Sequence, residues 1–207
     1  SMLRIWGRAN SINVQKVVWA AAELEVPFER IDAGGAYGGL DDPSYRAKNP
    51  NRRIPVVENG EVIVWESHAI LRYLGAVHGA GTLWPSAPVA RAPVDMWLDW
   101  YHTEGYTHLR DVFWQLIRTP AAERDHGLIE QQRAALDPKL AIPDAQLRET
   151  AFIAGEHFTI ADIAMGLLVH RWYRLDVART AYPALQRWYD ELSRRPAFQE
   201  YCAAPLT

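Results

Sequence analysis

Two short motifs in the first third of the chain have the residue types needed to bind one end of a small peptide. Ile54-Pro55 precedes two valines, and a turn signal at Asn59-Gly60 leads to a second apolar run that ends at Glu66-Ser67. Proline cannot donate to a sheet, so Pro55 is expected at a strand start, where a cis bond exposes the backbone of Ile54. Glu66 and Ser67 open an apolar helix, whose free N-terminal amides attract a carboxylate.

The order and spacing of these motifs resemble a segment of a known family. Asn-Pro at residues 49–50, then Ile-Pro-Val-Val, then Glu-Ser-x-Ala-Ile is similar to the glutathione-binding segment of cytosolic glutathione transferases. The resemblance is to bacterial members of the serine or asparagine type, related to the plant-type and fungal nitrogen-regulator-like members. It implies that Ile54 and a cis Pro55 pair with the cysteinyl backbone of glutathione. It also implies that Glu66 and Ser67 hold the γ-glutamyl end.

The elements expected around these motifs form an α/β domain over residues 1–79. Apolar spacing and strand-like alternation give the order β-α-β-α-β-β-α, which is that of a thioredoxin-like domain. The loop at 34–39 is rich in glycine. The strands and helices are predicted, in chain order, over residues 3–6, 13–24, 28–32, 43–48, 55–57, 62–64 and from 67 onward.

The rest of the chain is expected to be helical. Residues 80–88 have the composition of a linker, and 89–207 carry no strand signal. A long helix is predicted over 89–118, and a second stretch over about 121–147 contains prolines that should kink or split it. Thr159 and Asp162 are spaced as a capping box, which resembles the buried N-capping motif of the family. The predicted fold is a thioredoxin-like domain followed by an all-α domain, the glutathione transferase fold.

Glutathione chemistry requires a thiolate, because a free thiol with a pKa of about 8.5 is mostly protonated at neutral pH. Hydrogen-bond donors aimed at the sulfur lower that pKa. Ser11 lies five residues before Lys16-Val17, which matches the catalytic serine of the plant-type members. Asn13 is the alternative, because some fungal and bacterial relatives place an asparagine three residues before the Lys-Val pair. Asn10, Ser11 and Asn13 are also preferred helix N-caps, and a third possibility is that no single side chain dominates.

The position that would bind the glycyl carboxylate of glutathione departs from the family pattern. Relatives with the plant-type serine often carry His-Lys about fifteen residues before Ile-Pro, where this chain has Leu40 and Asp41. Neither side chain can bind a carboxylate. Arg53, directly before Ile54, is the predicted donor, because a guanidinium makes charge-assisted hydrogen bonds with carboxylates. Arg52 is the alternative.

The family resemblance places the electrophile pocket between the two domains. The loop after the first strand, with Asn10, and the first long helix, with Tyr106 and Arg110, are expected to line it. The resemblance also implies a homodimer, whose predicted interface includes the first long helix and residues 45–65.

Composition excludes several other classes of protein. Hydrophobic residues make up 49% of the chain and charged residues 23%, which is typical of a globular protein rather than a disordered or membrane-spanning one. The formal charge of −3 and the lack of a basic run argue against nucleic acid as a partner. Cys202 is the only cysteine, so no disulfide framework is expected. We expect no metal site, no signal peptide and a cytoplasmic location.

The leading interpretation is a glutathione transferase that conjugates the glutathione thiolate to small apolar electrophiles. An alternative on the same site is glutathione-dependent peroxide reduction or isomerisation. A third possibility is a glutathione-fold binding or regulatory protein with little catalysis. Tyrosine-type catalysis is disfavoured because the first strand has no tyrosine, and cysteine-type catalysis because Cys202 lies at the other end of the chain.

Overall fold

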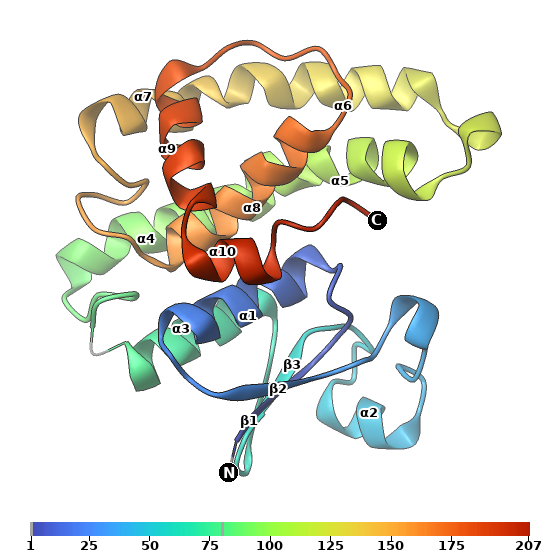
Figure 1. Cartoon of the computed structure of the whole chain (residues 1–207), viewed down its shortest axis with the longest axis vertical. Helices are drawn as coiled ribbons and strands as arrows, with labels where there is room; N and C mark the ends of the chain where they lie inside the picture. Colours follow the sequence, from blue (N-terminus) through green and yellow to red (C-terminus); the bar gives the residue numbers. More distant parts are fainter. Residues whose placement is uncertain (1, 80) are drawn as a thin grey trace. The chain divides into compact units, whose positions relative to one another are not determined.

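The structure, a computed structural model, describes residues 2–79 and 81–207. The chain divides into two units (Figure 1). One runs to Trp84 and includes Pro196–Ala203, and the other comprises Pro85–Arg195 and Ala204–Thr207. The elements of the first unit are β1 (Leu3–Trp6), α1 (Ile12–Glu23), β2 (Phe28–Ile31), α2 (Pro43–Lys48), β3 (Val56–Asn59), β4 (Val62–Trp65), α3 (Ser67–His78) and α10 (Pro196–Tyr201), with a 3₁₀ turn at Gly35–Tyr37.

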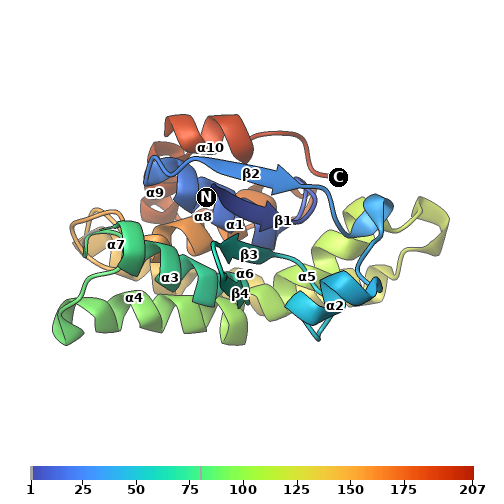
Figure 2. The same ribbon diagram turned by 90° about the horizontal axis from the view of Figure 1, so that it is seen from below.

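A mixed sheet in the order β2-β1-β3-β4 forms the centre of the first unit, and Figure 2 shows the strands in this order. β1 pairs in parallel with β2 and antiparallel with β3, and β3 pairs antiparallel with β4. This order and these directions confirm the predicted thioredoxin-like domain. The prediction of a short helix over 43–48 is also confirmed.

Helices cover the two faces of the sheet with different parts of the sequence. α1 and α3 pack against each other, and their apolar sides are fully buried, including Val14, Val17 and Leu71. On the other face, Tyr45 of α2 packs with Val56 and Trp6. Strand alternation explains this division, because Ile5 and Trp6 point to opposite faces. The predicted site residues Asn13 and Ser67 belong to α1 and α3, the helices that cover the first of these faces.

The last helix returns to the first unit. Phe198 of α10 meets Trp19 of α1 edge to face, with ring centroids 5.3 Å apart. Tyr201 lies 5.5 Å from Phe28, measured between ring centroids. The predicted ranges 1–79, 80–88 and 89–207 differ from this grouping of residues, and they stay a proposal about the domains of the chain.

The second unit is a bundle around one buried helix. Ile160–Trp172 of α8 are all buried, and α4, α5 and α9 pack against it. The elements are α4 (Pro88–Trp100), a π-helical segment (Tyr101–Tyr106), α5 (Thr107–Phe113), a second π-helical segment (Trp114–Arg118), a 3₁₀ turn (Ala121–Glu123), α6 (His126–Lys139), α7 (Ala141–Glu149), α8 (Ile160–Arg174) and α9 (Pro183–Ser193).

The proline positions agree with the predicted break in the second helical stretch. Pro138 lies in the last turn of α6, and Pro143 lies in the first turn of α7. A proline is tolerated near a helix start, because its missing N–H would have no partner there. None of the helices in the described part of the chain is long and apolar enough to cross a membrane.

Candidate functional site

The turn after β1 brings the start of α1 close to the Ile54 loop. Gly7 has φ of +145°, and a Cβ built on it would lie 2.3 Å from Val14 Cγ2 and 3.2 Å from Ile54 Cβ. Only glycine permits so close an approach. The loop that carries Asn10 and Ser11 therefore begins directly beside Ile54.

Ser11 is the N-cap of α1, and its hydroxyl accepts a hydrogen bond from Val14 N at 3.4 Å. Ser11 is buried, whereas Asn13 is half-buried. An accepting hydroxyl oxygen still carries its own proton, so capping does not prevent Ser11 from donating to a sulfur. The capping role considered for Asn10, Ser11 and Asn13 thus falls to Ser11.

Asn13 is oriented by two neighbours. Its Oδ1 accepts from Lys16 Nζ at 3.0 Å and from the Ser67 hydroxyl at 3.3 Å. Because the amide oxygen has these partners, the Nδ2 group of Asn13 points away from them and can serve as a donor. Both candidate thiol donors, Ser11 and Asn13, therefore remain chemically competent in this structure.

The Ile54-Pro55 peptide bond is cis, as predicted. The preceding residue is held from two sides, because the Arg53 carbonyl accepts from the Tyr45 hydroxyl and from Asn49 Nδ2, the latter at 3.0 Å. Burial raises the pKa of Tyr45 to about 12, so its hydroxyl keeps its proton and donates at neutral pH. Tyr45 within α2 and Asn49 at its C-cap thus fix the backbone just before Ile54.

The start of α3 combines an unusual backbone conformation with a buried hydroxyl. Glu66 has φ of +73°, which is rare for a residue other than glycine and costs about 1–3 kcal/mol. Its side chain is exposed and forms no capping hydrogen bond. Ser67 is buried, and its hydroxyl donates to Asn13 and accepts from Lys16 Nζ at 3.2 Å. Ser67 and Asn13, predicted for different parts of one ligand, are therefore in direct contact.

The sequence interpretation missed the role of Lys16. It treated Lys16 as part of a spacing pattern, whereas the side chain is completely buried between α1 and α3. Its Nζ contacts Asn13, Ser67 and His68. The sequence did contain a signal for this role, because Lys16 lies within the apolar stripe Val14, Val17 and Val18. A lysine is almost never fully buried unless its charge has partners.

The structure distinguishes the two arginines before Ile54. Arg52 Nη1 lies 2.9 Å from Asp41 Oδ1, and the backbone of Arg52 has φ of +56°. Arg53 is exposed, and its guanidinium forms no ion pair or hydrogen bond within residues 2–79 and 81–207.

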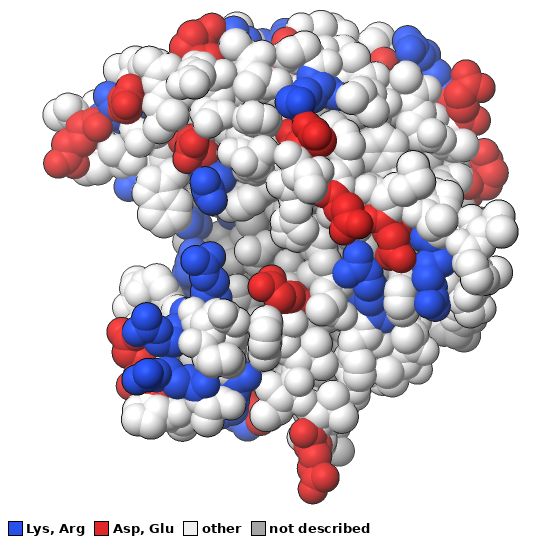
Figure 3. All heavy atoms as spheres, turned by 180° about the vertical axis from the view of Figure 1, so that it is seen from behind, with Lys and Arg blue, Asp and Glu red and all other residues white. Residues whose placement is uncertain are grey.

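Figure 3 shows lysine and arginine side chains gathered at the α2 end of the first unit. We use the name basic patch for Arg46 and Lys48 of α2 together with Arg52 and Arg53, which follow α2 in the sequence.

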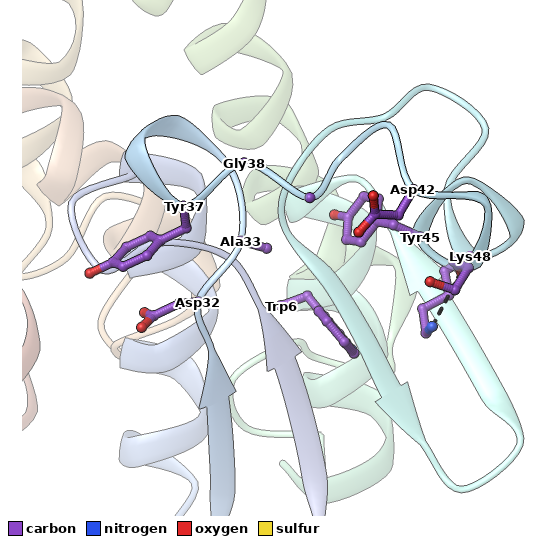
Figure 4. A pocket seen from close by; sticks show the side chains of 10 residues that line it. Trp6, Asp32, Ala33, Tyr37, Gly38, Asp42, Tyr45 and Lys48 are labelled. Carbon is purple, nitrogen blue, oxygen red and sulfur yellow. Dashed lines mark hydrogen bonds between the residues drawn. The ribbon is translucent and has the colours of Figure 1, made fainter.

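A separate cavity of about 150 Å³ lies on the α2 side of the sheet (Figure 4). Trp6 lines it, with Asp32, Tyr37 and Asp42 around it. Lys48 Nζ lies 5.0 Å from the Trp6 ring centroid, in cation–π contact. None of the predicted glutathione-binding residues lines this cavity, so it is distinct from the site around Ser67.

The residues predicted for the electrophile pocket belong to different units. Asn10 is half-buried in the first unit. In the second unit, Tyr106 stacks on buried Tyr101, with ring centroids 5.5 Å apart and ring planes 6° apart. Arg110 is exposed and pairs with Asp111 at 3.8 Å. A pocket that combines them stays a prediction.

No group of three or more histidine, cysteine, aspartate or glutamate side chains in the described residues is arranged to hold a metal ion. His108, for example, contacts Gln132 of α6 through Nδ1 at 2.6 Å. The site residues described above offer hydroxyl, amide and guanidinium groups, which are suited to a polar organic ligand.

The sheet order, the cis Ile54-Pro55 loop and the polar start of α3 define a thioredoxin-like unit joined to a helical unit. Comparison with protein families agrees with this class. Residues 1–76 match the glutathione S-transferase N-terminal domain, and residues 106–196 match the glutathione S-transferase C-terminal domain.

Individual relatives cover all or nearly all of the chain. Glutathione S-transferase GstB of Escherichia coli strain K12 is 36% identical over 208 residues, which is 100% of both chains. Glutathione S-transferase 3 of Zea mays is 28% identical and covers 98% of this chain and 94% of its own length. The chain belongs to the glutathione S-transferase family.

A solved structure of a relative carries the ligand that the sequence motifs indicate. The theta class glutathione S-transferase of Xanthomonas axonopodis pv. citri, with glutathione bound, superposes with a TM-score of 0.95 at 41% identity over 99% of each chain. Its apo form gives a TM-score of 0.85 at 35% identity, over 100% of this chain and 99% of that one. These likenesses confirm the predicted fold class.

Proposed function

We propose that this glutathione S-transferase binds glutathione in its first unit and conjugates the thiolate to small apolar electrophiles. The observation that carries this proposal is the junction of the starts of α1 and α3 through the hydrogen bond between Asn13 and Ser67. Two helix N-termini meet there, and each presents free amides and a positive dipole end to an anionic peptide. The glutathione-bound relative from Xanthomonas supports the choice of ligand.

The γ-glutamyl end of glutathione binds Glu66 and Ser67 in this proposal. The exposed carboxylate of Glu66 and the remaining lone pair of the Ser67 hydroxyl oxygen suit the α-ammonium group, and the amides at the start of α3 suit the α-carboxylate. The backbone of Ile54, ahead of Pro55, pairs with the cysteinyl residue. The positive φ of Glu66 supports this placement, because such conformations concentrate at ligand sites.

The glycyl carboxylate is bound by Arg53 rather than Arg52. Asp41 already pairs with Arg52, whereas the Arg53 side chain is exposed and its backbone is fixed by Tyr45 and Asn49. The surrounding basic patch attracts an anion at the end of the site where the family's His-Lys pair is missing. In this proposal Arg53 takes the place of the donors that are missing at Leu40 and Asp41.

The thiolate is stabilised by Ser11, with Asn13 as the alternative, and the sulfur attacks the electrophile directly. A positioned donor and a lowered thiol pKa are sufficient for this reaction. Asn10, Tyr106 and Arg110 stay the residues predicted for the electrophile pocket. Peroxide reduction or isomerisation remains the alternative on the same site, because both reactions use the same thiolate.

We also propose a cytoplasmic homodimer. β4 exposes Val62, Ile63 and Trp65 at 46%, 44% and 39%, and α4 exposes Met96 at 65%. Apolar side chains exposed together on one element mark an interaction surface. Sedimentation analysis tests this part, because Ile63→Lys on β4 is expected to produce a monomer. A monomeric wild type would contradict it. The single buried cysteine, Cys202, is typical of proteins from a reducing compartment.

Calorimetric titration with glutathione tests the binding site. Ser67→Ala is expected to weaken binding by about 1–2 kcal/mol, because one hydrogen bond to the ligand is lost. Ser44→Ala is a matched control, because Ser44 lies on α2 and lines the separate cavity. Unchanged affinity in Ser67→Ala would contradict the placement.

Turnover distinguishes the proposed reaction from its alternatives. Conjugation of an activated chloronitrobenzene, with rates that depend on glutathione, is expected. Turnover of an organic hydroperoxide without conjugation would favour the peroxidase. Glutathione binding with no turnover of any electrophile, peroxide or isomerisable substrate would identify a binding protein instead.

A further inference from the structure

The ammonium of Lys16 is buried at the junction of α1 and α3. Lys16 has no exposed surface, and its Nζ lies 3.0 Å from Asn13 Oδ1, 3.2 Å from Ser67 Oγ and 2.9 Å from His68 Nε2. Burying an ammonium is costly unless hydrogen bonds compensate for its lost hydration. A lysine is therefore a poor choice here for stability alone, and well-packed apolar residues often replace such groups without loss.

Each of these three contacts is of a kind that an ammonium N–H can make. Asn13 and Ser67 accept through oxygen, and His68 accepts through Nε2, which requires the tautomer with its proton on Nδ1. The ammonium consequently determines the direction of two other groups. Ser67 accepts from Lys16, so its own proton is directed to Asn13 Oδ1 at 3.3 Å. With its oxygen bonded to Lys16 and Ser67, Asn13 presents Nδ2 outward.

Lys16 therefore connects the two halves of the proposed glutathione site. Ser67 belongs to the part of the site that binds the γ-glutamyl end, and Asn13 to the part that can reach the thiol. Both side chains have rotamers available without the ammonium, and in those rotamers the Ser67 oxygen and the Asn13 amide point elsewhere. Groups held in one rotamer before the ligand arrives bind it more tightly.

We propose that Lys16 is a positioning residue, which orients the Ser67 hydroxyl and the Asn13 amide for glutathione. The inference rests on the proposed function, because it assigns Ser67 to the γ-glutamyl end. Lys16 itself does not touch the ligand in this proposal. Its effect on binding is transmitted by Ser67, and this separates it from a residue that merely supports the fold.

The test is a double-mutant cycle on glutathione affinity, measured by calorimetry. Lys16→Met keeps the length of the side chain and removes its charge and its hydrogen bonds. We expect it to weaken glutathione binding about tenfold while the denaturation midpoint stays the same or rises, because a buried charge is removed. Lys139→Met is the matched control, since Lys139 pairs with Glu104 in the second unit at 2.8 Å. It is expected to leave the affinity unchanged.

The double variant Lys16→Met, Ser67→Ala identifies the route of the effect. If Lys16 acts through Ser67, the double variant binds within about twofold of Ser67→Ala alone, because interacting residues are not additive. Two losses that simply multiply would overturn the positioning role. Wild-type affinity in Lys16→Met, with weakened binding in Ser67→Ala, would also overturn it while leaving the proposed function intact. A wild-type protein that does not bind glutathione would instead refute the proposed function.

Discussion

The helix starts of α3 and α8 both lie beside buried polar side chains, but the hydrogen bonds at the two starts differ. At the start of α8, the Asp162 carboxylate accepts from Ile153 N and Thr159 N, both at 2.9 Å, and from Trp188 Nε1 at 2.8 Å. Thr159 completes the predicted capping box. At the start of α3, Glu66 is exposed and makes no capping hydrogen bond.

The difference separates a polar cluster that serves the fold from one that is suited to a ligand. Every partner of Asp162 named above is an N–H of the protein itself, and Ala161 N in the first turn of α8 donates to Thr159 Oγ1. α3 begins with a strained residue and an exposed carboxylate beside a buried serine. A helix start of that kind is less stable by itself and is suited to a ligand that supplies the missing partners.

The largest expected effect comes from removing the carboxylate at the α8 start. Asp162→Ala leaves three N–H groups without their acceptor in a buried region, and we expect a loss of about 3–5 kcal/mol in the free energy of unfolding. Urea denaturation measures it. Glu66→Ala is the counterpart at the α3 start. It is expected to change stability by no more than about 0.5 kcal/mol while weakening glutathione binding. Equal losses of stability in the two variants would end the distinction.

The pH dependence of stability sharpens the same comparison, because Asp162 and His170 of α8 have shifted pKa values of opposite sign. Burial raises the pKa of Asp162 from 3.8 to about 6, although its three N–H donors oppose the shift. Its contribution to stability is therefore fully present below pH 3.8 and is lost as the pH rises through 6. Burial, with Arg174 and Arg171 nearby, lowers the pKa of His170 from 6.5 to about 4. The His170 contribution is present above pH 6.5 and is lost as the pH falls through 4.

Each contribution amounts to about 3 kcal/mol, so the two slopes largely cancel in the wild type. Asp162→Asn is expected to leave a stability that rises from pH 4 to pH 6.5, and His170→Gln a stability that falls between pH 4 and pH 6. Urea midpoints measured across this range test the prediction. Identical profiles for the two variants would contradict it.

The next effect concerns catalysis at the α1 start. Ser11→Ala is expected to raise the kinetic pKa for conjugation and to lower kcat about tenfold, with little effect on glutathione affinity. The pH dependence of single-turnover rates measures this. If Asn13→Ala produces these changes and Ser11→Ala does not, the two roles are exchanged. If neither variant shifts the pKa, backbone amides stabilise the thiolate.

The sequence was sufficient to predict the elements of the first unit because their signals are local. Strand alternation at 3–6 and 62–64, and the Ile-Pro pair at 54–55, correspond to β1, β4 and the cis bond of the structure. The capping box of α8 was also predictable, because Thr159 and Asp162 are only three residues apart. The indole donor of Trp188, which belongs to α9, comes from a distant part of the chain and was not.

The interruptions of the long helix were also not predictable, because they too involve contacts with a distant part of the chain. Helical periodicity over 89–118 suggests one helix, whereas the structure has π-helical segments at Tyr101–Tyr106 and Trp114–Arg118. Gly105 lies against Leu168 of α8, so close that an added Cβ would be 2.9 Å from Leu168 Cδ2. A contact made by a buried helix sixty residues away leaves no mark on the local pattern.

The site itself divides in the same way. Residue types and spacing predicted Ser11, Asn13 and Ser67 as candidates, and family resemblance supplied the roles proposed for them. The pairing of Arg52 with Asp41, which favours Arg53 for the carboxylate, needed coordinates. The burial of Lys16 needed them too, because it depends on how α1 and α3 pack.

The return of α10 to the first unit has a consequence for the order in which the protein is made. The segment from β1 through α3 is synthesised early. Phe198 and Tyr201, which contact Trp19 and Phe28, are synthesised more than a hundred residues later. Until then the growing polypeptide presents an uncovered tryptophan side chain on α1. The first unit can therefore acquire its sheet during synthesis and complete its packing only after the second unit has been translated.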